Sequence, residues 1–233
     1  MIKYIASMLC ISLLFSCTTE VDSPSSQCSG EPSSSSRTFI DRRDSKSYRY
    51  VKIGTQTWMA ENLNYEVKGS KCYTNLKDYC GIYGKLYDWA TAMGLDSTYN
   101  STLYSVETKH TGICPSGWHI PSDAEWGTLM KFINPNCPPT SDCVFAGMLL
   151  KDSIGWNSGN GTDAYGFSAL PGGYGNSDGT FKGIVTDGNW WSTSEVNSNN
   201  VYYRVATHNS DDIIRYNYTN GKSGFRSIRC LKD

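Results

Sequence analysis

The chain has 233 residues, with 21 lysine and arginine residues against 22 aspartate and glutamate residues. This balance of charge, without a basic cluster, gives nucleic-acid binding no electrostatic support, so we expect no nucleic acid among the partners. The chain also contains 7 Trp, 16 Tyr and 22 Gly, which is typical of a turn-rich domain with large aromatic side chains and few long helices.

Residues 1–16 have the pattern of an export signal. Lys3 is followed by an apolar run ending at Phe15, which is shorter than the roughly 20 residues of a membrane-spanning helix. A small residue stands directly before Cys17, as in a bacterial lipobox, so we expect a lipid on the Cys17 thiol that holds the protein to a membrane. Thr18, in place of an aspartate, favours the outer membrane of the cell envelope. The alternative is an ordinary secretory signal that contains a cysteine.

Residues 17–36 are rich in serine and proline and have too few apolar side chains to form a core. This composition predicts a flexible tether. The folded part then begins near Arg37 and runs to Asp233, a length that suits one domain with a substantial core.

The first predicted elements are a hairpin and a helix. Tyr48–Ile53 alternates and is rich in aromatic and β-branched residues, and Gln56–Met59 returns after a two-residue turn that starts with Gly54. A turn with glycine first predicts a type II′ hairpin. Apolar residues then recur with helical spacing over Tyr83–Met93, and Gly94 is expected to end that helix.

A second helix is predicted after Pro121, because Ser122 and Glu125 have the spacing of a capping box. Its buried stripe is expected to be Trp126, Leu129, Met130 and Ile133. From Gly147 onward, short apolar pieces interrupt Gly, Asn, Asp and Ser, and two of these, Ile213–Tyr216 and Arg226–Arg229, are expected to be antiparallel strands. The predicted fold class is therefore α+β, with two helices, short antiparallel strands and long Gly/Asn/Ser-rich loops.

The expected folded part contains six cysteines: Cys72, Cys80, Cys114, Cys137, Cys143 and Cys230. In an exported chain such a set favours disulfides over free thiols. Short loops favour two local bonds and leave one long-range pair: Cys72–Cys80, Cys137–Cys143 and Cys114–Cys230. The long-range bond would stabilise the fold by about 4–5 kcal/mol if loop entropy dominates. A zinc site is the competing interpretation, but the spacings do not fit it.

Five motifs stand in order along the chain: Val51–Gly54 with Gln56–Leu63, Tyr83–Trp89, Cys114–His119, Gly166–Gly173 and Trp190–Glu195. Together they resemble the Fibrobacter succinogenes major paralogous domain family, over about Arg43 to Asp233. The resemblance implies an exported or cell-surface module and brings no defined biochemical role.

Three segments, His119–Trp126, Gly188–Ser192 and Gly224–Arg226, are also similar to the formylglycine-generating enzyme superfamily. The fold of that superfamily is related to C-type lectins, so the similarity implies a C-type-lectin-like architecture. The enzyme uses two nearby cysteines late in its chain, whereas here only Cys230 follows Cys143. That chemistry is therefore not carried over.

Two kinds of ligand site are suggested by the residues. Trp190 and Trp191 are adjacent, so in a strand they face opposite sides and one of them is a candidate for contact with a ligand such as a sugar. Oxygen-bearing side chains in the Gly-rich loops offer ligands for calcium: Asn160, Asp163, Asn176, Asp178, Asp187 and Asn189. The favoured explanation for these six is that turns require such residues, and no other cofactor is expected.

The sequence contains no G-x-S-x-G, Walker or dinucleotide-binding motif. Asp123 and Glu125 are explained by helix capping, and His119 is more simply a packed histidine, so we predict no catalytic residue. The favoured function is a surface-anchored, non-catalytic module that binds polysaccharide or another surface protein. Two alternatives remain: an envelope hydrolase or modifying enzyme with an unrecognised site, and a purely structural envelope lipoprotein.

Overall fold

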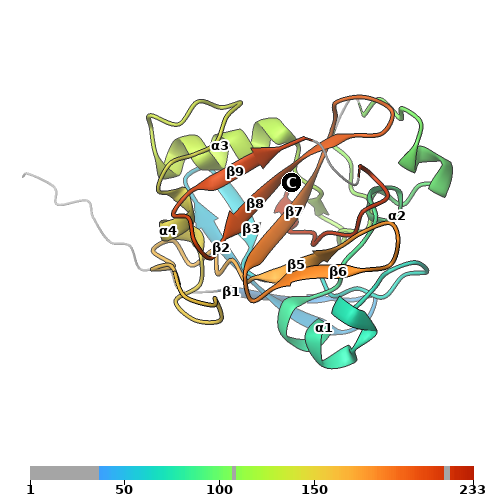
Figure 1. Cartoon of the computed structure of the whole chain (residues 1–233), viewed down its shortest axis with the longest axis horizontal. Coiled ribbons are helices and arrows are strands. Elements are labelled where there is room, and N and C mark those ends of the chain that lie inside the picture. The colour runs from blue at the N-terminus through green and yellow to red at the C-terminus, as the bar shows by residue number, and fades with distance from the viewer. Residues whose placement is uncertain (1–36, 107–108, 218–220) are drawn as a thin grey trace, which may run out of the picture. The chain divides into compact units, whose positions relative to one another are not determined.

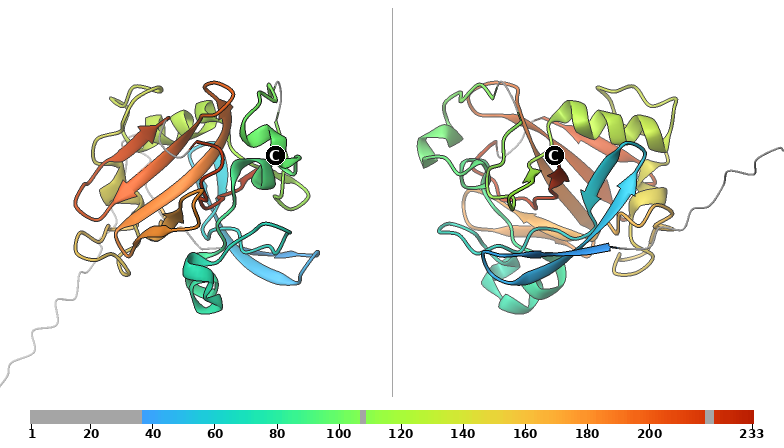
Figure 2. Two further views of the ribbon diagram at one scale, coloured as in Figure 1. Left: turned by 45° about the vertical axis from the view of Figure 1, so that its right-hand side comes forward. Right: turned by 180° about the vertical axis from the view of Figure 1, so that it is seen from behind.

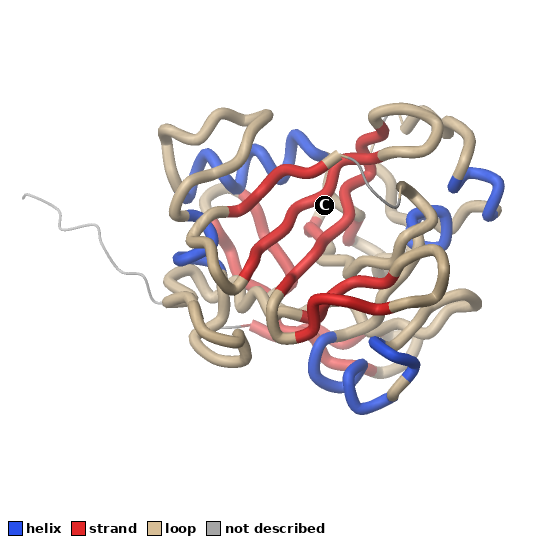
Figure 3. The backbone as a smooth tube through the Cα atoms, viewed as in Figure 1, coloured by secondary structure: helices blue, strands red, loops and turns tan. Residues whose placement is uncertain are grey.

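A computed structural model of the chain describes residues 37–106, 109–217 and 221–233. The predicted signal, Cys17 and the predicted tether lie outside these residues. Short helices and strands alternate in the described part, so the α+β class is confirmed. Figure 3 shows the strands in the centre, the helices around the rim and long loops between them.

The described residues form four α-helices instead of the predicted two: α1 (Lys77–Tyr83), α2 (Trp89–Met93), α3 (Asp123–Ile133) and α4 (Ala146–Leu150). Two 3-10 turns accompany them, η1 (Tyr73–Asn75) and η2 (Ser97–Asn100). None of the helices in the described ranges has the length and apolar character needed to cross a bilayer.

The first sheet has the strand order β1-β2-β3-β10-β4 and is antiparallel. Its strands are β1 (Arg37–Asp41), β2 (Lys46–Ile53), β3 (Gln56–Met59), β4 (Trp118–His119) and β10 (Leu231–Lys232). Strand β10 therefore lies between β3 and β4, which come much earlier in the sequence, and it joins them into one sheet.

The second sheet has the order β6-β5-β7-β8-β9. Its strands are β5 (Gly172–Gly175), β6 (Phe181–Ile184), β7 (Asp187–Glu195), β8 (Val201–Thr207) and β9 (Ile213–Tyr216). Only the pairing of β5 with β7 is parallel among these described strands. The second sheet lies in front in Figure 1, and the first lies in front when the molecule is turned in the right panel of Figure 2.

The predicted hairpin is confirmed as β2 and β3. Gly54 has a φ of 59°, whereas Thr55 is not among the residues with positive φ, as a type II′ turn requires. A Cβ atom at Gly54 would also come within 2.7 Å of the Phe132 ring. Both the turn and the packing against α3 therefore require glycine here.

The helix predicted over Tyr83–Met93 is wrong in its first half. Helix α2 begins only at Trp89, after the side chain of Asp88 caps the backbone N–H of Thr91, and it ends at Gly94 as expected. The preceding residues are extended because Leu86 pairs with Lys71, and Tyr87 with Arg226. Pairing with distant segments therefore overrides the local helical spacing.

Helix α3 forms as predicted, and its capping box is complete. The Ser122 hydroxyl accepts from the Glu125 backbone N–H, and the Glu125 carboxylate accepts from the Ser122 backbone N–H. The predicted stripe, Trp126, Leu129, Met130 and Ile133, is buried. Among the terminal segments, Ile213–Tyr216 is the predicted strand, but Arg226–Arg229 makes only isolated bridges, because its partners Tyr87 and Trp190 lie in two separate segments.

Three disulfides join the expected pairs, Cys72–Cys80, Cys114–Cys230 and Cys137–Cys143. The Cys114–Cys230 bond spans 116 positions and links the segment before β4 to the segment before β10. It therefore fixes the last strand of the chain within the first sheet.

Two hydrophobic clusters lie on opposite sides of β7. Trp190 belongs to the cluster that contains α3, whereas Trp191 belongs to the one that contains Trp89 and Tyr87. Adjacent residues in a strand point to opposite faces, so β7 is buried on both faces at this position.

A buried polar centre connects the two sheets at Asn62, whose side chain uses both its oxygen and its amide group. The oxygen accepts from Trp190 Nε1 at 2.8 Å and from Arg229 Nη2 at 3.0 Å, and the amide donates to Tyr83 O at 2.8 Å. Burial lowers the pKa of Arg229 to about 9, and its remaining N–H groups donate to backbone carbonyls, including that of Ser168. Asn62 thus orients a buried cation that has no directly bonded carboxylate among the described residues.

Candidate functional site

The prediction that Trp190 or Trp191 contacts a ligand is wrong. Each of the two side chains is only 1% exposed. Trp190 Nε1 donates to Asn62, and Trp191 Nε1 donates to the Tyr87 carbonyl at 2.8 Å. Both rings therefore belong to the scaffold.

The six candidate calcium ligands do not come together. Asn160, Asp163, Asn176 and Asp178 each bond to a residue within five positions, as turn-forming side chains do: to Trp156, Ser168, Thr180 and Thr180, respectively. The described residues hold no group of three or more His, Cys, Asp or Glu side chains placed to bind a metal ion.

The two remaining candidates, Asp187 and Asn189, line a groove of about 230 Å³ on the second sheet. We call it the tyrosine groove. Its lining residues are Tyr174, Asp187, Asn189, Tyr203, Val205, Thr207, Ile214, Tyr216 and Arg226. In Figure 1 the strands that carry most of them, β7, β8 and β9, lie side by side.

Strand pairing arranges this face of the sheet in three rungs of residues that face one another. The first rung crosses β7 and β8, and the other two also reach β9. The rungs are, in order, Asp187–Thr207, then Asn189–Val205–Ile214, then Trp191–Tyr203–Tyr216. Successive rungs are two residues apart on each strand, so they share one face of the sheet. The middle rung has smaller side chains than the third, which forms an aromatic wall beside it.

The aromatic wall is extended by Arg226. Its guanidinium carbon lies 4.2 Å from the centroid of the Trp191 ring and 4.0 Å from that of Tyr203. Tyr203 stacks in turn on Tyr216, with 5.7 Å between ring centroids. Burial lowers the pKa of Arg226, and Tyr203 and Tyr174 oppose this effect. Arg226 thus covers both Trp191 and Tyr203, and Tyr203 is buried, so Tyr174 and Tyr216 are the more exposed rings of the groove.

Asn189 is the unusual group in the groove. Its side chain is only 5% exposed, and its Nδ2 has no hydrogen-bond partner among the described residues. An unpaired buried donor costs about 1–3 kcal/mol, so nearly all such groups in proteins are paired. Asp187 stands one rung away, and burial raises the pKa of its carboxyl, with His208 opposing the shift. Asn189 Nδ2 itself has almost no accessible surface, so it is enclosed by the protein, and Asp187 is the polar group that faces the groove.

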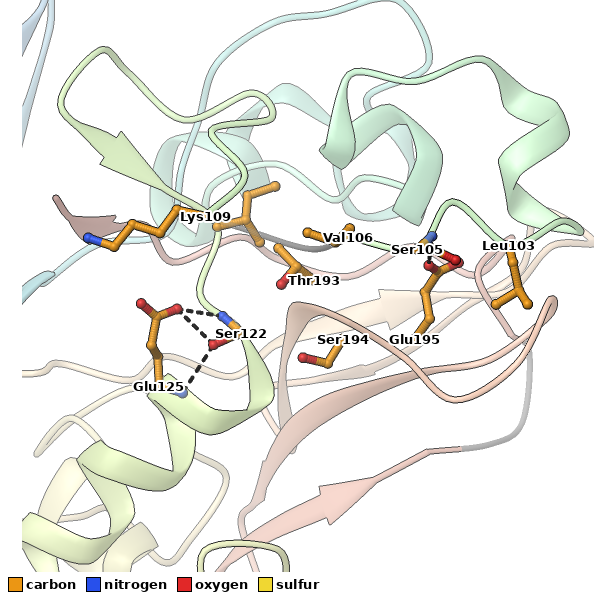
Figure 4. A pocket seen from close by; sticks show the side chains of 10 residues that line it. Leu103, Ser105, Val106, Lys109, Ser122, Glu125, Thr193, Ser194 and Glu195 are labelled. Atoms are coloured by element: carbon orange, nitrogen blue, oxygen red, sulfur yellow. Dashed lines mark hydrogen bonds between the residues drawn. The ribbon is translucent and has the colours of Figure 1, made fainter.

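A second cavity, of about 540 Å³, is bordered by the N-terminus of α3 and the end of β7. We call it the serine cavity, after its hydroxyl side chains Ser105, Ser122, Thr193 and Ser194. Figure 4 shows Glu125 and Lys109 at one end of it and Glu195 at the other.

Both glutamates of the serine cavity are bound to the protein itself. Glu195 accepts from the Ser105 backbone N–H at 2.7 Å and pairs with buried Lys222 at 2.5 Å. Glu125 bonds to Ser122 and to His119. Burial tends to raise the pKa of Glu125, but the bonds to His119 and Ser122 outweigh it and lower the pKa to about 2.

His119 is buried between two carboxylates. Its Nδ1 lies 2.6 Å from Asp233 Oδ1, and its Nε2 lies 3.0 Å from Glu125 Oε1. Burial tends to lower the pKa of His119, but both carboxylates raise it and prevail. His119, which the sequence predicts to be a packed histidine, thus links Asp233 to α3 through two ion pairs.

Comparison with known proteins places this architecture in a family. The family model of the Fibrobacter succinogenes major domain matches residues 51–232. The chain belongs to this family. No curated protein and no solved structure matches it. The region that matches the Fibrobacter succinogenes major domain contains every residue that lines the tyrosine groove and the serine cavity.

In this member of the family, the motifs that carry the resemblance build the scaffold. Asn62 comes from the first motif and Trp190 from the last, and they bond to each other. The groove residues Tyr174, Tyr203 and Tyr216 lie outside those motifs, and the sequence analysis did not predict them. The signal that identifies Tyr203 and Tyr216 is alternation along β8 and β9, read together with the strand register.

Proposed function

We propose that the protein is a non-catalytic, lipid-anchored module of the cell envelope that binds polysaccharide through the tyrosine groove. The observation that carries the proposal is the lining of this groove, which combines Tyr174 and Tyr216 with the polar residues Asp187 and Thr207. Sugars combine hydroxyl groups with apolar C–H faces, so they suit a groove that has both polar groups and tyrosine rings.

The wider setting of the proposal comes from the sequence. Cys17 in its lipobox and the serine-rich residues 17–36 support an anchor and a tether, with Thr18 favouring the outer membrane. Two small sheets joined by long loops support a C-type-lectin-like fold.

The hydrolase alternative has less support. Two glutamates line the serine cavity, as a glycosidase would require. However, a pKa of about 2 keeps Glu125 ionised at neutral pH, so it cannot donate a proton, and Glu195 is paired with Lys222. A purely structural role, in turn, assigns no task to the tyrosine groove.

The test is retention of residues 18–233 on insoluble cellulose, xylan and pectin, with and without a chelator. We expect retention on at least one polymer, and we expect Tyr216→Ala to weaken it by about 2- to 10-fold, because an aromatic contact contributes about 0.5–1.5 kcal/mol. Tyr104→Ala is the matched control, since Tyr104 and Tyr216 are both 37% exposed and Tyr104 lies outside the groove. Lack of retention on all three polymers would contradict the proposal.

A further inference from the structure

We infer that the tyrosine groove holds a single sugar ring at the end of a glycan chain, and that the rest of the chain leaves the groove over β9. The inference rests on the proposed function and adds which part of the polysaccharide is bound. It follows from the size of the groove, from its closed end on β5 and from its open end on β9.

The size of the groove limits the ligand to one unit. Its volume is about 230 Å³. Cavities for drug-sized ligands measure about 300–1,000 Å³, so this groove lies below that range and has room for about one sugar ring. A polysaccharide therefore places one unit in the groove, while its other units lie outside.

The floor of the groove is a row of side chains that crosses four strands. Strand register places its members side by side on β5, β7, β8 and β9: Tyr174, Asn189, Val205 and Ile214. Asn189 and Val205 are almost completely buried. The polar contacts of a ligand therefore come from the walls of the groove and not from its floor.

Two walls run along this row. On one side Tyr216 stacks on the buried ring of Tyr203, so Tyr216 is the exposed ring of the aromatic wall. On the other side Asp187 and Thr207 face each other across β7 and β8 and both line the groove. A sugar ring between the walls meets a tyrosine ring with its C–H groups, and a carboxylate and a hydroxyl with its own hydroxyls.

Tyr174 closes the groove at β5. Burial raises the pKa of its hydroxyl, Asp187 raises this pKa further, and Arg226 lowers it. Asp187 belongs to one wall and Arg226 to the other, so the Tyr174 hydroxyl lies close to both. All three residues line the groove. The Tyr174 side chain therefore stands across this end, where a chain would otherwise pass.

The end at β9 has no comparable barrier among the described residues that line the groove. The outermost of them, Ile214 and Tyr216, belong to β9 itself. Asp142 and Cys143 bond to the outer edge of this strand, but neither lines the groove. A terminal unit needs only this one exit for the rest of its chain, whereas a unit from the middle of a chain needs two.

Calorimetric titration with soluble sugars of increasing length tests the inference. The series are xylose to xylohexaose, glucose to cellohexaose, and galacturonate to its hexamer, which match the three polymers. For the series that binds, we expect affinity to change by less than about threefold from one unit to six, because one unit makes the contacts. A chain that passed through the groove would gain about tenfold or more from one unit to three, and that result would overturn the inference.

The insoluble polymer allows a second test, in which chain ends are counted. Mild acid hydrolysis cuts the chains and raises the number of ends at constant polymer mass. We expect the protein retained at saturation to rise about in proportion to the number of ends. Retention that stays constant while the ends increase contradicts the inference. Reduction of the reducing ends then lowers retention if those ends are bound and leaves it unchanged if the opposite ends are bound, so either result identifies the bound end.

Tyr174→Ala tests the closed end. Every chain presents the same single unit to Tyr174, so we expect this variant to weaken binding by about 2- to 10-fold at all lengths alike. Tyr104→Ala is again the control. A loss that grows with chain length would show that Tyr174 contacts more than the terminal unit. Thermal melting of each variant shows whether it is folded.

The outcomes separate the inference from the proposed function. If affinity rises with chain length, the inference is overturned, while retention on the polymers still supports glycan binding. If neither the polymers nor the sugars bind, the proposed function fails and the inference fails with it.

Discussion

At the scale of single residues, two buried asparagines have opposite surroundings. Asn62 is 7% exposed and Asn189 is 5% exposed. Asn62 uses its amide and its oxygen to join Trp190, Arg229 and Tyr83, whereas Asn189 leaves its Nδ2 unpaired. Burial alone therefore does not show whether the side chain of an asparagine is bonded to its surroundings.

This contrast predicts opposite effects of one substitution. Asn189→Val removes an unpaired donor, so we expect the free energy of unfolding to rise by about 1 kcal/mol. Asn62→Val leaves the Trp190 and Arg229 donors unpaired, so we expect the free energy of unfolding of this variant to fall by about 3 kcal/mol or more. Urea unfolding measures both changes. A loss of stability in Asn189→Val comparable to that in Asn62→Val would contradict the role given to Asn189.

At the scale of elements, the parts of the fold that the sequence predicts are those fixed by local chemistry. Gly54 sets the turn of the hairpin, and Ser122 with Glu125 starts α3. The helix predicted from Tyr83 fails because Leu86 and Tyr87 pair with remote segments. Periodicity alone cannot reveal such pairing.

The sequence singles out two residues of the groove but not the groove itself, for a related reason. Asp187 and Asn189 were recognisable as polar residues in a Gly-rich region, although the calcium role given to them was not what the structure indicates. Which tyrosines accompany them depends on the pairing of β7, β8 and β9, which places Tyr203 and Tyr216 in register beside Trp191. Arg226, far along the chain, then covers Trp191, and no local pattern in the sequence reveals this contact.

The link between β4, α3 and the chain end predicts a pH dependence. His119 has a raised pKa, so its contribution to the free energy of unfolding is complete below its usual value of 6.5 and is lost as pH rises through the folded value. Glu125 has a pKa of about 2 against a usual 4.5, so its contribution is complete above 4.5 and is lost as pH falls toward 2. We expect the link to contribute most between pH 4.5 and 6.5.

His119→Gln tests this dependence, because glutamine keeps a hydrogen-bonding group but does not titrate. Urea unfolding at a series of pH values should show wild-type stability decreasing above pH 6.5 and a flatter profile in the variant. Equal slopes for the two proteins above that pH would show that His119 is not the group responsible.

At the scale of the whole molecule, the disulfides differ in the length of chain that they close. Cys114–Cys230 spans 116 positions and Cys137–Cys143 spans 6. On the loop-entropy model, replacing the first pair by alanines costs about 4–5 kcal/mol and replacing the second about 2 kcal/mol. Urea unfolding of the two double variants tests this order. Equal losses would show that the long-range bond does not act mainly on the unfolded chain.

The place of β10 also has a consequence for how the protein is made. Leu231 pairs with both Trp58 and His119, and Cys230 bonds to Cys114, so the first sheet stays open until the chain has been synthesised through these residues. A nascent chain that has not yet reached Leu231 therefore lacks the strand that joins β3 to β4. The hairpin of β2 and β3 can form early, whereas the five-stranded sheet forms only after residues 230–232 are available.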